Sequence, residues 1–137
     1  MSIEQNKAIM RRYVEEVWNR GNISVINEFV APNHVGHRPG KDIKGLVEFK
    51  DWVTSNRNAF PDLHFEIQSQ IAEEDMVVTT WTLTGTHQGE FMGIAATGKK
   101  FTGPGVSIYR LSEGKLVESW GYWDRLSVLQ QVGVIQI

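Results

Sequence analysis

The chain has 137 residues, of which 14 are basic and 16 are acidic, so its formal net charge is −2. This near balance offers no basic surface for nucleic acid, and no apolar run reaches the length that crosses a membrane. Because the chain contains no cysteine, disulfides, thiolate nucleophiles and zinc–thiolate sites are excluded. The length predicts one domain over residues 1–137, and the absence of a signal-like N-terminus predicts a cytoplasmic protein.

Helical patterns fill the first 60 residues. Ser2 and Gln5 have the spacing of a capping box for a first helix, and Gly21 is a stop signal for it. A short second helix is expected over residues 23–30. The apolar stripe over residues 49–60 predicts a third helix.

The pattern then changes to strands. Residues 33–45 are rich in glycine and histidine, and we expect a loop there with a short edge strand at most. Alternating or β-branched runs predict four strands, over residues 63–71, 76–87, 101–111 and 115–124. Most of these strands are joined by short turns, which require antiparallel neighbours.

This order of elements predicts the α+β class. Three N-terminal helices should pack on one face of a strongly bent, mostly antiparallel sheet, with a short helix at the C-terminus.

Asp124 lies between an aromatic strand and the last helical pattern, and two interpretations of it remain open. It can cap the helix that follows, since Asp is a favoured N-cap residue. Alternatively, Ser127 and Gln130 form a second capping box, S-x-x-Q, that leaves Asp124 free to act as a base. A carboxylate desolvated beside Trp120 and Tyr122 would become more basic, whereas capping would stabilise its anion.

The strand before Asp124 carries aromatic residues at both parities. Trp120 and Tyr122 share one face with Asp124, and Trp123 lies on the other. A small monomer rarely exposes two tryptophans, so we expect one face to line a cavity and the other, bearing Trp123, to form a homodimer interface.

Three segments together resemble the SnoaL-like polyketide cyclase family of the nuclear transport factor 2-like fold. They read FPDLHFEI, WTLTGTHQGEFMGIAATGKKF and YRLSEGKLVESWGYWDRLSVLQQVG. The resemblance spans nearly the whole chain and implies a cone-shaped α+β barrel around a hydrophobic pocket. It further implies that Asp124 is the acid/base of an intramolecular aldol ring closure on a polyketide ester, without metal or cofactor.

The remaining candidates are proposed as contacts for a small hydrophobic substrate. His37 matches a position where members of the family often carry histidine, and each of the others has a simpler structural role as its alternative. The set is His37, Trp81, His87, Phe101, Trp120 and Tyr122. A metal site at His34, His37 and Asp42 is disfavoured, because their spacing matches no familiar ligand set.

Three functions remain open on this fold. The first is the cyclase or a related enolate reaction, and the second is a binding protein for a small hydrophobic ligand. The third is an enzyme resembling ketosteroid isomerase or limonene-epoxide hydrolase, and the latter needs several acidic and amide groups around a water molecule. The fold alone does not decide between them.

Overall fold

The computed structural model describes residues 1–136. Its first helical region is longer than one regular helix. The capping box predicted at Ser2 and Gln5 is present and begins α1 (Ile3–Tyr13). The chain continues without a break into a π-helical segment, η1 (Val14–Asn19), which ends before Gly21 with its positive φ of 66°.

The next two helical regions are also close to those predicted. A 3-10 turn, η2 (Ile23–Val25), leads into the single-turn helix α2 (Ile26–Phe29). The third predicted helix is α3 (Gly45–Ala59), which begins four residues earlier than its apolar stripe indicated.

The sheet has six strands in the order β2-β1-β6-β5-β4-β3. The four predicted strands are β3 (His64–Glu73), β4 (Met76–Thr86), β5 (Lys100–Ser112) and β6 (Lys115–Trp123). They form an antiparallel meander, and the turns at Glu74 and Glu113 use positive φ angles.

The expectation of a loop over residues 33–45 is wrong. Most of this segment forms β1 (Val30–Arg38) and β2 (Lys41–Lys44), an antiparallel hairpin. Strand β1 is internal to the sheet, because it also pairs in parallel with β6. The sheet is therefore mixed, with one parallel pair among antiparallel ones.

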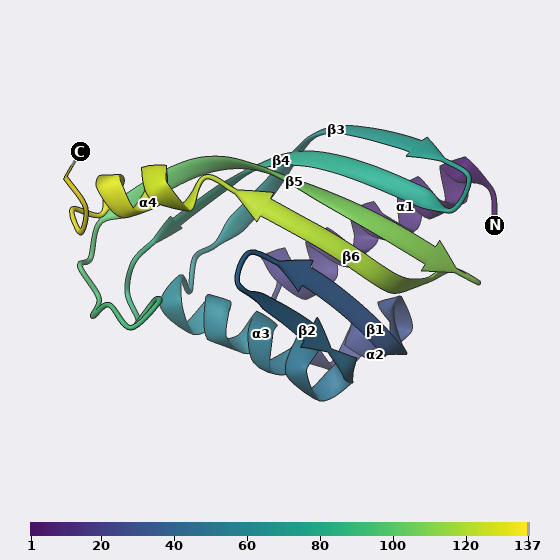
Figure 1. Ribbon diagram of the computed structural model, residues 1–137, viewed down its shortest axis with the longest axis horizontal. Coiled ribbons are helices and arrows are strands. Elements are labelled where there is room, and N and C mark those ends of the chain that lie inside the picture. Colours follow the sequence, from purple (N-terminus) through teal and green to yellow (C-terminus); the bar gives the residue numbers. More distant parts are fainter. Residues whose placement is uncertain (137) are drawn as a thin grey trace.

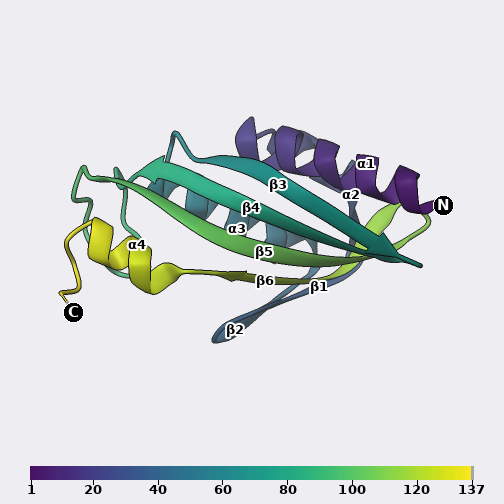
Figure 2. The same ribbon diagram turned by 90° about the horizontal axis from the view of Figure 1, so that it is seen from above.

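The helices cover one face of the bent sheet and leave the other face open. Figures 1 and 2 show α1 and α3 on the same side of the strands, with the short helix α4 (Arg125–Gln131) beyond the end of β6. Apolar side chains from α1, α3 and the inner face of the sheet make one buried cluster. Among the described residues, no helix is long and apolar enough to cross a membrane.

Candidate functional site

A pocket of about 110 Å³ lies between the inner face of the sheet and the helices. Every tryptophan of the chain contributes to its lining, from η1, α3, β4 and β6: Trp18, Trp52, Trp81, Trp120 and Trp123. Phe65, Tyr13 and Tyr109 add further aromatic surface. Such walls present flat, rigid apolar surfaces to a ligand.

The pocket lies beside the end of β6, where that strand is no longer paired with β1. The pairing of β1 with β6 ends at His37 and Trp120, so residues 121–123 have no β1 partner. Lining residues from the β1–β2 hairpin and from the start of α4 flank this gap, among them Arg38 and Arg125. These two arginines therefore approach the pocket from different elements.

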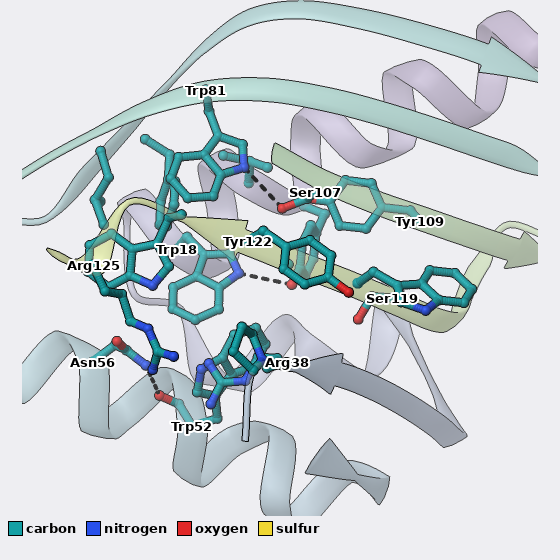
Figure 3. A pocket seen from close by; sticks show the side chains of 18 residues that line it. Trp18, Arg38, Trp52, Asn56, Trp81, Ser107, Tyr109, Ser119, Tyr122 and Arg125 are labelled. Atoms are coloured by element: carbon teal, nitrogen blue, oxygen red, sulfur yellow. Dashed lines mark hydrogen bonds between the residues drawn. The ribbon is translucent and has the colours of Figure 1, made fainter. Parts of the chain in front are cut away.

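Several polar side chains of the wall are paired with each other. The indole of Trp81 donates to Ser107 Oγ at 3.0 Å, and the indole of Trp18 donates to Tyr13 Oη at 2.9 Å (Figure 3). Burial raises the pKa of Tyr109 to about 12, and it raises that of Tyr13 well above the usual value. Both phenols are thus protonated at neutral pH and do not act as bases.

Arg38 is the charged group most closely packed into the pocket. Its guanidinium carbon lies 4.2 Å from the ring centroid of Trp52, as Figure 3 shows beside α3. Burial, with repulsion from Arg125, lowers the pKa of Arg38 to about 10, so the side chain remains charged at neutral pH.

A buried histidine–serine pair reaches the pocket wall, and the sequence analysis missed it. Ser119 lines the pocket, and its Oγ lies 2.9 Å from Nε2 of His34, a residue with 0% exposure. The two residues lie 85 positions apart and meet through the parallel β1–β6 pairing. Only a correct prediction of β1 as a strand could have brought them together.

The expectation of a desolvated, uncapped Asp124 is wrong. Asp124 is exposed and is itself the N-cap of α4, with Oδ1 accepting a hydrogen bond from the Ser127 amide at 3.0 Å. The predicted second capping box does not form, since Ser127 lies inside the helix and accepts a hydrogen bond from Gln131. Asp124 does not line the pocket, although Trp123 and Arg125 on either side of it do.

Half of the predicted substrate contacts line the pocket, namely Trp81, Trp120 and Tyr122. Phe101 is part of the buried core and packs on Phe60, outside this lining. His87 is also buried, with Nδ1 lying 3.1 Å from Thr97 Oγ1.

His37 does not line the pocket. Its ring stacks on Trp120, with Nε2 2.6 Å from Glu118 and Nδ1 3.3 Å from Asp42. His34 points inward to Ser119, so the two imidazoles do not converge on a common metal position.

The prediction that the face of Trp123 meets a second subunit is also wrong. Trp123 packs within its own chain against Phe91 and Phe101, with ring centroids 6.0 and 6.3 Å apart. The face that no helix covers is the other one (Figure 2).

Known proteins resemble this chain over nearly its whole length. A model of the SnoaL-like polyketide cyclase family matches residues 8–132. The aklanonic acid methyl ester cyclase DauD of Streptomyces sp. (strain C5) is 28% identical, over 91% of this chain and 80% of its own.

Two solved structures extend the likeness to the fold. AclR, a putative hydroxylase from Streptomyces galilaeus, has a TM-score of 0.87 and 32% identity, over 99% of this chain and 85% of its own. A putative polyketide cyclase from Acidithiobacillus ferrooxidans has a TM-score of 0.82 and 35% identity, over 96% of this chain and 97% of its own. The chain has the nuclear transport factor 2-like fold and belongs to the SnoaL-like polyketide cyclase family.

Proposed function

We propose that this protein is a cyclase that closes a ring in a polyketide-like ester by intramolecular aldol addition. The observation that carries the proposal is the pocket itself, which gathers every tryptophan of the chain around one small space. Flat walls of this kind hold a planar polycarbonyl chain folded, which brings the reacting carbons into contact. The names of the cyclase relatives support the same reaction class.

The charges of the wall suit an enolate. Its polar side chains are hydroxyl, amide, indole and guanidinium groups, and none of the lining residues is Asp or Glu. In the reaction a base removes the proton from a carbon between two carbonyls, and the resulting carbanion attacks a third carbonyl. The new alkoxide then takes up a proton, so the product is an isomer of the substrate. Donors and cations stabilise the negative oxygens that form on this path.

We propose Asp124 as the acid/base, acting from the mouth of the pocket. The proposal is supported by its flanking residues Trp123 and Arg125, which both line the pocket. The cap bond to Ser127 engages Oδ1, and the second carboxylate oxygen is the one proposed to take the proton.

Two substitutions at Asp124 separate the cap from the chemistry. Asn caps helices about as well as Asp, so Asp124→Asn should preserve stability while lowering turnover by about 100-fold or more. Asp124→Ala should lose turnover and also about 1 kcal/mol of unfolding free energy. The assay follows conversion of aklanonic acid methyl ester to an isomer of equal mass by liquid chromatography. Full turnover by a folded Asp124→Asn variant would remove Asp124 from the mechanism.

One observation favours a binding protein as the second candidate. The lining residues include no carboxylate, and Asp124 is exposed. If the wild-type protein binds the ester without isomerising it, this second function is the correct one. An epoxide hydrolase-like enzyme is not supported, because the wall lacks the acidic groups that would activate water.

We keep three of the predicted substrate contacts, Trp81, Trp120 and Tyr122, because they line the pocket. His37, His87 and Phe101 are not proposed as contacts, since they lie outside its lining.

We also propose a homodimer, now through the outer face of the sheet. The strand register places Ile71, Val78 and Ile108 side by side across β3, β4 and β5. Ile71 is 67% exposed, and no helix covers this face (Figure 2). An apolar row of this kind is suited to the same row on a second copy.

A further inference from the structure

The pocket contains a buried donor for which the protein supplies no acceptor. Arg38 ends β1, and the face of its guanidinium packs on the Trp52 ring. Its Nε atom is buried and has no hydrogen-bond partner within the described chain. Stacking uses only the face of a guanidinium, so the N–H groups at its edge remain free to bind an acceptor. A buried donor without an acceptor is destabilising, which calls for an explanation.

A second buried donor in the same wall also lacks an acceptor. The indole Nε1 of Trp52 is also buried without a partner among the described residues. Both residues line the pocket and lie against each other. Two adjacent donors of this kind are available to bind oxygen atoms of a ligand.

Three hydroxyl groups of the wall are hydrogen-bonded to other side chains of the protein. Trp81 donates to Ser107 and Trp18 donates to Tyr13, while Ser119 is bonded to His34. Arg38 Nε and Trp52 Nε1 bond to none of these hydroxyl groups within the described residues.

The pocket wall also carries positive charge without negative charge. Arg38 and Arg125 both line it, and neither joins a salt bridge in the part of the chain that the structure describes. Burial and the proximity of Arg125 lower the pKa of Arg38 to about 10. The fold thus holds two cations at one pocket, and no acidic side chain lines the pocket with them.

We infer that the ligand of this pocket carries a free carboxylate, which accepts hydrogen bonds from the Arg38 guanidinium and the Trp52 indole. Two carboxylate oxygens match the fork of guanidinium N–H groups and an adjacent third donor. The inference rests on the proposed function, because it assumes that this pocket binds the substrate. It narrows the substrate class from esters in general to compounds that also bear an acid group at the Arg38 end.

The test compares two probes that share the naphthalene ring and differ in charge, 2-naphthoate and its methyl ester, methyl 2-naphthoate. Isothermal titration calorimetry on the wild-type protein should show the acid binding about tenfold tighter, since hydrogen bonds to a charged acceptor are stronger than those to a neutral one. Arg38→Met keeps a long side chain over Trp52 and should reduce the preference to within about twofold. Arg38→Lys keeps the charge and should retain part of the preference, which controls for misfolding of the Met variant.

Arg12→Met is the matched control. Arg12 also lies over an aromatic ring, with its guanidinium carbon 5.3 Å from the ring centroid of Phe29, but it is exposed and does not line the pocket. This variant loses the same charge from the protein and should keep the full preference for the acid.

Any one of three other results would overturn the inference. If acid and ester bind equally to the wild-type protein, the carboxylate assignment fails while the aromatic pocket stands. If Arg38→Met keeps the preference, another group recognises the acid. If neither probe binds, the inference falls together with the pocket as a site for aromatic ligands, whereas the isomerisation assay still tests the reaction separately.

Discussion

His34 is a histidine that the fold keeps neutral. It has no exposed surface, its ring meets Phe49 edge-on at 5.1 Å, and Nε2 is paired with Ser119. Burial, and secondarily the nearby His37, lowers the pKa of His34 to about 4. At neutral pH the imidazole is therefore an uncharged partner for the Ser119 hydroxyl at the pocket wall.

This histidine should make the protein sensitive to mild acid. Between pH 6.5 and about 4 the unfolded chain binds a proton at His34 and the native chain does not, so the unfolding free energy falls as the pH falls. The full loss is on the order of 3 kcal/mol. His34→Gln keeps a group that can bond Ser119 but cannot titrate, and it should flatten this dependence in urea unfolding at pH 7 and pH 4.5.

The exposed His64 of β3 provides the control for this measurement. His64→Gln should leave the pH dependence as it is in the wild-type protein. An unchanged slope in His34→Gln would contradict the assignment.

Asp124 shows what sequence could and could not decide for a single residue. The sequence is compatible both with Asp124 as the N-cap and with a capping box that starts at Ser127, because the two helix starts differ by only three residues. The backbone decides between them, since Asp124 has the non-helical φ of −79° and ψ of 75° and Ser127 is helical.

Among the elements, the π-helical segment η1 depends on a single arginine of α3. Arg57 Nη1 donates to the carbonyl of Trp18 at 2.6 Å and to that of Asn19 at 3.2 Å. Nη2 of the same side chain donates to the Pro61 carbonyl at 3.0 Å. One guanidinium therefore joins the end of η1 to the end of α3 and fixes the backbone that carries Trp18 into the pocket.

Replacing Arg57 with Met should destabilise the protein by about 1–3 kcal/mol, because carbonyl groups lose a charged donor. Arg20→Met provides the comparison, since Arg20 forms exposed ion pairs with Glu15 and Glu16 that contribute about 1 kcal/mol or less. Urea denaturation of both variants measures the difference. Equal midpoints for the two variants would show that the clamp is unimportant.

The four meander strands were predictable because each pairs with a neighbour in sequence and keeps a clear apolar alternation. Strands β1 and β2 were not, since Gly36, Pro39 and Gly40 are typical of loops. Local signals did not reveal β1 because it is stabilised by a partner, β6, that lies far along the chain. The same pairing builds the His34–Ser119 contact, so the missed strand and the missed site residues have one cause.

For the whole molecule, the uncovered face of the sheet predicts a dimer. Ile71→Lys places a charge in the exposed apolar row and should convert the proposed dimer to a monomer. Val47→Lys is the control, because Val47 is 75% exposed on α3, away from this face. Sedimentation velocity at micromolar protein concentration distinguishes the two states. A monomeric wild-type protein under these conditions would exclude the proposed interface.

The parallel pairing of β1 with β6 also bears on how the protein is made. During translation β1 leaves the ribosome long before β6 is synthesised. Until then, the edge of β1 that pairs with β6 has no partner strand. Contacts that distant in sequence close slowly, because the intervening chain must lose entropy first. The wall that β6 contributes can therefore form only late, and ligand binding should mark the completion of folding in a newly made chain.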